Sequence, residues 1–266
     1  MKRVKLIVAI LVLFMGGNMA YAGQFGAMEP VSEYGKISLG IGYFYYSDKL
    51  EPKDTEGTWI SWKKSKVTQN QAYLQLGCGL FPKHEIYLRV GGADIKVPDA
   101  FLTSADSPDI AGFKDKFKDS LKPFGTIGFK GGYNFAPPFG IGYFVNTSLG
   151  SNYKDKTAGT YLGFSATQEM KIKRPWEVNL GVGLQGKIGE VILYAGPVVY
   201  WARSKVEWEG AIPGVGNISD STTYKEKNNL GGFAGLRLPL GKGFNIEVES
   251  QLKSRFSAGG SLVYSF

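Results

Sequence analysis

Residues 69–95 have the sequence QNQAYLQLGCGLFPKHEIYLRVGGADI, and this stretch decides the fold. Apolar residues occupy every second position on both sides of a short turn at Phe81-Pro82-Lys83-His84. The positions between them hold polar residues, tyrosine or glycine. Successive side chains of a strand point to opposite faces, so a period of two predicts strands with one apolar face. Two such strands joined by a short turn form a β-hairpin. The apolar positions are Ala72, Leu74, Leu76, Cys78, Leu80, Ile86, Leu88 and Val90.

The same pattern recurs along the chain. We predict four hairpins, at about 69–95, 123–150, 174–206 and 228–253, each closed by a short turn. Longer polar segments separate them, at about 47–65, 96–122, 151–172 and 207–227. An opening strand at about 36–46 and a closing strand at about 256–266 bring the predicted number of strands to ten. Eight and twelve strands stay open as alternatives.

The beginning of the chain predicts export. Lys2, Arg3 and Lys5 precede an apolar run at 6–15, and small residues follow as far as Ala22. This order predicts a secretory signal peptide at 1–22, cleaved after Ala22. The apolar run is about half of the roughly 20 residues that a spanning helix needs. We expect a short periplasmic segment at 23–35 next, followed by the strands at 36–266.

Composition and the length of the apolar runs define the fold class. Hydrophobic residues make up 43% of the chain, yet its mean hydropathy is −0.12, and no apolar stretch after residue 22 comes near 18 residues. If this chain spans a membrane, it must do so as a closed barrel, because only helices and closed barrels satisfy their backbone hydrogen bonds in lipid. Short turns that alternate with long loops are the layout of outer-membrane barrels, whose short turns face the periplasm. We therefore predict an all-β, closed antiparallel transmembrane β-barrel of about ten strands over 36–266, with long extracellular loops.

Residues 160–172 are themselves strand-like. Counting them as a spanning strand gives eleven, whereas bacterial single-chain barrels have an even number of strands. We therefore assign them to an extended loop hairpin.

The last strand ends in alternating apolar residues, Leu262, Tyr264 and Phe266. A terminal phenylalanine with an aromatic residue two positions earlier resembles the C-terminal signal of outer-membrane proteins. Together with the hairpin pattern, the chain resembles the small outer-membrane barrels of the OmpA-like, OmpW-like and opacity-protein type. The resemblance implies that the barrel assembly machinery recognises this strand, and that the mature protein is a monomer in the bacterial outer membrane.

The polar faces of the predicted strands carry charges of both signs. In a narrow lumen, ion pairs are favoured over unpaired charge, which is expensive to confine. We therefore expect a filled interior and a structural or surface-interaction role, such as adhesion or shielding. A narrow channel or transporter for small or hydrophobic solutes stays open as the alternative. The predicted lumen charges are Arg89, Lys130, Glu177, Arg237, Glu247 and Glu249.

The sequence does not predict an enzyme. Its one histidine, His84, lies in a predicted periplasmic turn, away from chemistry at the cell surface. Cys78 falls on the predicted lipid face, where a thiol acts as a small hydrophobe. We find no motif for a cofactor, a metal ion or a nucleic acid.

Two loops carry further predictions. In 107–121 the apolar positions 110, 113, 117 and 121 recur at helical spacing, which predicts a short amphipathic helix. The first long loop holds lysines next to tryptophans, a combination suited to the phosphate groups of lipopolysaccharide in the outer leaflet. The residues of this possible lipopolysaccharide contact are Trp59, Trp62, Lys63, Lys64 and Lys66.

Overall fold

The computed structural model describes residues 25–57, 61–212, 214 and 216–266, and it is an all-β protein. Thirteen strands form one antiparallel sheet, and the described residues contain no helix. Within the same residues, no helix is long and apolar enough to cross a membrane.

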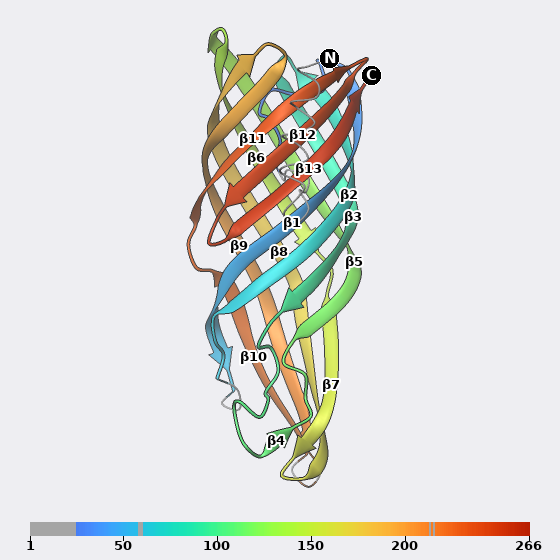
Figure 1. Cartoon of the computed structure of the whole chain (residues 1–266), viewed down its shortest axis with the longest axis vertical. Helices are drawn as coiled ribbons and strands as arrows, with labels where there is room; N and C mark the ends of the chain where they lie inside the picture. The colour runs from blue at the N-terminus through green and yellow to red at the C-terminus, as the bar shows by residue number, and fades with distance from the viewer. Residues whose placement is uncertain (1–24, 58–60, 213, 215) are drawn as a thin grey trace, which may run out of the picture.

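Ten of the strands close into a ring, which confirms the predicted barrel and its strand number. Around the ring the order is β9, β11, β12, β13, β1, β2, β3, β5, β6 and β8, and the pairing of β8 with β9 closes it (Figure 1). The four predicted hairpins are β2–β3, β5–β6, β8–β9 and β11–β12. The ring strands are β1 (Ile37–Glu56), β2 (Ser65–Phe81), β3 (His84–Val97), β5 (Phe117–Ala136), β6 (Phe139–Gly150), β8 (Phe164–Ile188), β9 (Val191–Ile212), β11 (Leu230–Gly241), β12 (Phe244–Leu252) and β13 (Phe256–Ser265).

Three further strands extend the barrel at the end opposite the short turns (Figure 1). β7 (Tyr153–Tyr161) forms a hairpin with the first part of β8, so residues 160–172 are the extended loop hairpin that we predicted. β10 (Gly216–Glu226) pairs with both β9 and the last part of β1. β4 (Ile110–Ala111) adds a short edge to β7.

The helix predicted at 107–121 is wrong. Residues Phe117 to Ser120 begin β5, where Phe117 pairs with Val97 of β3. Ile110 and Phe117 are buried, Phe117 within the apolar core at this end, and Gly112 adopts a φ of +78°. A helix this short is marginal in water, so strand pairing and burial of the two apolar residues determine the conformation.

Along each long strand, the apolar face changes sides. In β3 the outward residues pass from Leu88 and Val90 to Asp94 and Lys96, while the inward residues pass from Glu85 and Arg89 to Ile95 and Val97. We call residues 37–46, 71–92, 123–149, 176–201 and 230–266 the turn-side half, and residues 47–56, 61–70, 93–122, 150–175 and 202–226 the loop-side half. The turn-side half is apolar outside and holds buried charges inside, beside aromatic side chains such as Phe144 and Phe233. The loop-side half has an apolar core inside and charged side chains outside.

A β-bulge in β8 makes the same change by a different route. The register with β9 shifts between Lys173 and Trp176, around Arg174, whose φ is +46°. Because of the extra residue, the buried positions switch from even numbers such as Ile172 to odd numbers such as Glu177. β-Bulges characteristically redirect side chains in this way.

Candidate functional site

The first described residues lie inside the barrel. Phe25, Ala27 and Met28 are completely buried in the turn-side lumen. The prediction of a short periplasmic segment at 23–35 did not anticipate that Phe25 to Ser32 enter the barrel. We call residues 25–32 the plug.

The plug is held by lumen side chains that bind its backbone. The Glu249 carboxylate accepts hydrogen bonds from the backbone amides of Phe25 and Gly26, at 3.3 and 2.9 Å. One carboxylate oxygen of Glu85 accepts hydrogen bonds from the backbone amides of Val31 and Ser32, at 2.7 and 3.0 Å. Charged acceptors give the stronger class of hydrogen bond, so the plug binds firmly without forming a strand.

Arg237 holds the plug from the carbonyl side. Its guanidinium donates to the carbonyl oxygens of Ala27 and Pro30, both at 3.3 Å. The same guanidinium pairs with Glu247 at 2.5 Å. Buried charge is tolerated only when it is paired and hydrogen-bonded. Arg237 meets this condition, because it forms an ion pair with Glu247 and donates hydrogen bonds to two plug carbonyls.

Two apolar side chains anchor the plug. The Phe25 ring stacks on Phe144 with centroids 4.1 Å apart and meets the edge of Phe233 at 5.5 Å. Met28 lies against glycines of the wall: a Cβ added to Gly142 would come within 2.3 Å of the Met28 Cβ. Glycines on the inward face therefore make room for the plug.

All six predicted lumen charges have buried side chains inside the barrel. Besides Arg237, Glu247 and Glu249, Arg89 donates to Gln75 at 2.7 Å and lies over the rings of Tyr73 and Tyr87. Lys130 Nζ lies 3.9 Å from Glu85, a residue that the sequence analysis did not select. Glu85 follows the short turn directly, and its place on the inward face was the signal for it.

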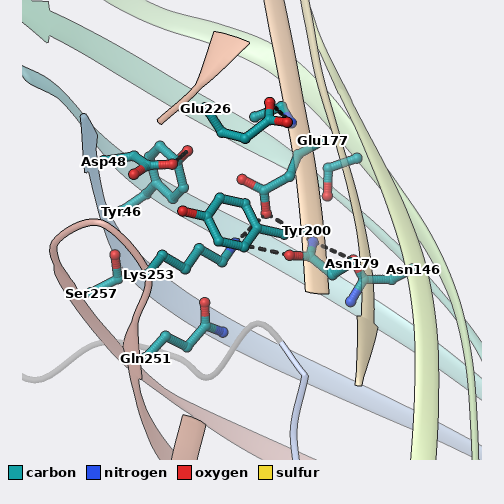
Figure 2. Close-up of polar contacts among 12 residues, drawn as sticks. Tyr46, Asp48, Asn146, Glu177, Asn179, Tyr200, Glu226, Gln251, Lys253 and Ser257 are labelled. Carbon is teal, nitrogen blue, oxygen red and sulfur yellow. Dashed lines mark hydrogen bonds and ion pairs between the residues drawn. The ribbon is translucent and has the colours of Figure 1, made fainter. Parts of the chain in front are cut away.

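A second missed residue, Lys253, reaches Glu177 and Asn179 inside the barrel (Figure 2). Its Nζ donates to Glu177 at 2.6 Å and to Asn179 at 2.9 Å, and Asn179 donates to Asn146 at 2.9 Å. The ammonium also lies 5.8 Å from the centre of the Phe25 ring. Because Lys253 belongs to the turn between β12 and β13, the alternation of strand residues does not include it. We call Lys253, Glu177, Asn179 and Asn146 the cover.

An apolar chamber lies on the other side of the cover. Its cavity has a volume of about 330 Å³ and includes Glu177 in its lining. The lining is mostly the apolar core of the loop-side half, with Ile95, Val97, Phe101, Met170, Ile172 and Val206. Burial raises the pKa of Tyr153 in this lining to about 12, so its hydroxyl stays protonated and donates to the Ala93 carbonyl at 3.3 Å.

The residues of the possible lipopolysaccharide contact do not act as one cluster. Trp59 lies outside the described residues. Lys63 pairs with Asp106 at 3.3 Å and Lys64 with Glu51 at 2.8 Å, while Lys66 lies half-buried on β2. The Thr103 amide and the Lys63 ammonium hold the pKa of Asp106 below its usual value. Trp62 packs inward against the chamber core.

The C-terminal residues lie on the outer surface at the turn side. Leu262 and Phe266 are exposed, and Tyr264 lies between Phe244 and Phe266 with ring centroids 4.7 and 4.8 Å away. The three rings form an aromatic cluster at the edge of the apolar belt.

The two reactive side chains considered from the sequence, His84 and Cys78, lie on β3 and β2. His84 stacks on Phe129 in its turn, and its Nδ1 lies 2.8 Å from the Pro82 carbonyl oxygen. Cys78 is a free thiol. Within the residues that the structure describes, no group of three or more histidine, cysteine, aspartate or glutamate side chains could hold a metal ion.

No family model and no curated protein matches the sequence. Solved structures with a similar fold are outer-membrane β-barrels. The outer membrane protease OmpT from Escherichia coli is 10% identical, with a TM-score of 0.48 over 90% of this chain and 100% of that one. The translocator domain of the autotransporter NalP from Neisseria meningitidis is 8% identical, with a TM-score of 0.45 over 88% and 90%. A deletion mutant of the monoaromatic hydrocarbon channel TodX is 9% identical, with a TM-score of 0.33 over 88% and 89%. With scores below 0.5, none of them bears on the activity of this protein.

The position of the plug predicts how a thiol placed in it would react. In a Cys78→Ser background, we expect Ala27→Cys to resist a membrane-impermeant maleimide in the folded protein and to react after denaturation. Lys154→Cys, at an exposed position on the loop side, should react at once and serves as the control. Mass spectrometry of the labelled protein measures both. Equal labelling of the two folded variants would place the segment outside the lumen.

Proposed function

We propose that this protein is an exported, integral outer-membrane β-barrel whose lumen is closed by its own N-terminal segment. Its role is structural or in surface interaction, carried out by the loop-side half outside the membrane. The observation that carries this proposal is the filled lumen: plug, ion pairs and cover succeed one another along the barrel interior.

The outer surface of the turn-side half supports membrane insertion. Large apolar side chains stand exposed around the ring, and hydrocarbon is the solvent that would favour them. The aromatic cluster of Phe244, Tyr264 and Phe266 lies where an interfacial girdle is expected. Members of the exposed belt include Ile41, Leu74, Val90, Ile127, Leu184 and Leu193.

The outer surface of the loop-side half suits water and the headgroup region. Ion pairs cover it, among them Lys171 with Glu209 at 2.7 Å and Lys154 with Glu169 at 2.9 Å. We propose that Lys66 and the exposed parts of Lys63 and Lys64 contact lipopolysaccharide phosphates. We also propose that the barrel assembly machinery recognises Leu262, Tyr264 and Phe266, and that the protein works as a monomer.

Because the lumen is closed, we expect the protein to conduct no ions. Purified protein inserted into a planar lipid bilayer should show no steady single-channel steps, because the plug, the buried ion pairs and the cover fill the lumen one after another. Insertion is verified separately by protection of the belt from protease in vesicles. Steady steps whose size follows the salt concentration would reject the closed barrel.

A gated path for small solutes is the second candidate. It is favoured by one observation: residues 25–32 pair with no strand, so the plug can leave the lumen without breaking the ring. Steps that appear only intermittently, under applied voltage, would support this function instead.

A further inference from the structure

We propose that a basic patch on the outer surface, formed by Lys173, Arg203, Lys205 and Lys225, binds the phosphate groups of lipopolysaccharide. These residues lie on three neighbouring strands, β8, β9 and β10 (Figure 1). None of them belongs to the contact proposed above for the first long loop. The assignment rests on the proposed function, because it requires the turn-side half to lie in the outer membrane and the loop-side half to lie outside it.

The patch begins where the apolar belt of β9 ends. Trp201 is 40% exposed, and Arg203 and Lys205 follow it on the same outward face, since the residues between them are buried. On β8, Trp176 lies directly opposite Arg203. Tryptophan is enriched at the boundary between hydrocarbon and headgroups. In a membrane, Arg203 therefore lies just outside the hydrocarbon, at the level of the lipid phosphates.

The strand register places like charges opposite each other in the patch. Lys205 lies opposite Lys173 of β8, and Arg203 lies opposite Lys225 of β10. Directly opposite side chains have Cβ atoms about 4.5–5.5 Å apart, and like charges at such positions are destabilising. An anion bound between these cations would remove the repulsion.

Carboxylates compensate only part of this charge. Glu207 is shared between two lysines, at 2.5 Å from Lys173 and 3.6 Å from Lys205. Lys225 lies 3.6 Å from Asp54. These two carboxylates face four cations, so the patch keeps an excess of positive charge.

Lysines near the same boundary on β3 and β5 differ from those of the patch. Lys96 lies 3.7 Å from Asp94, and Lys122 lies 3.7 Å from Asp119. Each of these lysines has a carboxylate of its own within a few residues. They provide a matched comparison, with the same kind of side chain near the same level but without the excess charge.

Arg203 is the residue of the patch that selects phosphate. It is exposed, and it forms no ion pair with any residue that the structure describes. A guanidinium binds phosphate through two parallel hydrogen bonds, which a lysine cannot do. Lipid A, the membrane anchor of lipopolysaccharide, carries a phosphate at each end of an acylated disaccharide. Its phosphates would contact the patch while its acyl chains cover the belt near Trp201.

The probe is lipid A, titrated into the full mature protein in detergent micelles and counted as bound molecules by native mass spectrometry. We expect saturable binding that weakens at high salt, because the charges are exposed. Arg203→Gln combined with Lys205→Gln should bind about tenfold more weakly, the loss of a charge-assisted hydrogen bond. Lys96→Gln combined with Lys122→Gln removes the same charge and should bind as the unmodified protein does. Equal binding by the two double variants would overturn the patch.

Two further ligands identify the chemical group and its source. Lipid A without its phosphates keeps the acyl chains, and we expect it to bind weakly and equally to the unmodified protein and to the Arg203→Gln, Lys205→Gln variant. Phosphatidylglycerol has a single phosphate and should bind more weakly than lipid A. If dephosphorylated lipid A bound as tightly as lipid A, the acyl chains would be the recognised group. If phosphatidylglycerol did so, the patch would bind anionic lipids in general. Either result would reject lipopolysaccharide as the ligand.

Unfolding by urea gives a readout whose sign depends on the ligand. Without lipid A, the Arg203→Gln, Lys205→Gln variant should be at least as stable as the unmodified protein, because like charges have been removed. With saturating lipid A, the unmodified protein should become the more stable of the two, since a ligand of the folded state raises the free energy of unfolding. The same order of stability with and without lipid A would refute the site.

Protection from protease in vesicles separates this inference from the proposed function. A protein that inserts into vesicles but whose patch variant still binds lipid A normally would lose the patch and keep its proposed place in the membrane. Failure of the unmodified protein to insert would remove both.

Discussion

Deleting residues 25–32 should convert the silent barrel into a conducting one. The plug fills the turn-side lumen with two large apolar side chains and a backbone bound by Glu85, Arg237 and Glu249. Without it, these three charged side chains lose their plug partners, and the cover still lies between the lumen and the chamber. We expect single-channel steps in a planar bilayer where the unmodified protein shows none.

The matched control for the deletion is Phe25→Ala. It leaves the plug backbone and its hydrogen bonds in place, so the lumen should stay closed although the loss of a buried ring costs about 3–5 kcal/mol of stability. A deletion variant that is folded and inserted yet silent would show that the cover, and not the plug, closes the barrel. Resistance of the variant to unfolding by detergent at room temperature establishes that it is folded.

The second large effect is expected at Lys253. Lys253→Met removes the ammonium that pairs with the buried Glu177 and leaves that carboxylate without its cation. Breaking a buried ion pair from one side costs about 3–5 kcal/mol, because the remaining charge is uncompensated. Unfolding by guanidinium in lipid vesicles, followed by tryptophan fluorescence, measures the loss in the free energy of unfolding.

Two further variants distinguish the effect of breaking the ion pair on stability from the effect of losing a lysine side chain. Lys253→Met combined with Glu177→Gln should recover most of the lost stability, since no unpaired charge is then buried. Lys173→Met breaks an ion pair with Glu207 on the outer surface, where the lysine side chain is 41% exposed, and should cost less than about 1 kcal/mol. If the buried and exposed lysines gave equal losses, burial of the cover would not explain its stability.

The ring of strands was predictable because its cause is local. Alternation in 69–95 and its repetition at three more hairpins require only neighbouring residues, and short turns fix which strands pair. The strand number followed once 160–172 was assigned to a loop hairpin, as β7 and β8 confirm.

The plug and the cover depend on contacts that are distant in sequence. Phe25 and Glu249 are separated by 224 positions, and Lys253 and Glu177 by 76. Neither the plug nor the turn that carries Lys253 has a periodic pattern, so no rule based on spacing identifies them. The helix predicted at 107–121 failed for a related reason: its spacing matched a helix, but pairing with β3 and β7 and burial of Ile110 and Phe117 overrode it.

The reversal of faces left a trace in the sequence. In 84–97 the large apolar residues fall on even positions as far as Val90 and on odd positions from Ala93 onwards. The inward positions of this strand are odd throughout, so the change of parity indicates that the apolar face moves from the outside of the barrel to its inside. The signal is absent from β8, where the bulge near Arg174 lets even-numbered apolar residues such as Ile172 and Leu180 lie on opposite faces.

This reversal means that one strand is stable in two different solvents at once. The half that carries Ile95, Val97 and Phe117 has an apolar core inside and charged side chains on its outer surface, as a soluble protein does. The half that carries Leu88 and Val90 exposes its apolar side chains and needs lipid or detergent around them. Removal of detergent should therefore destabilise one end of the barrel first. Unfolding should begin near the short turns, while the strands at the opposite end stay folded.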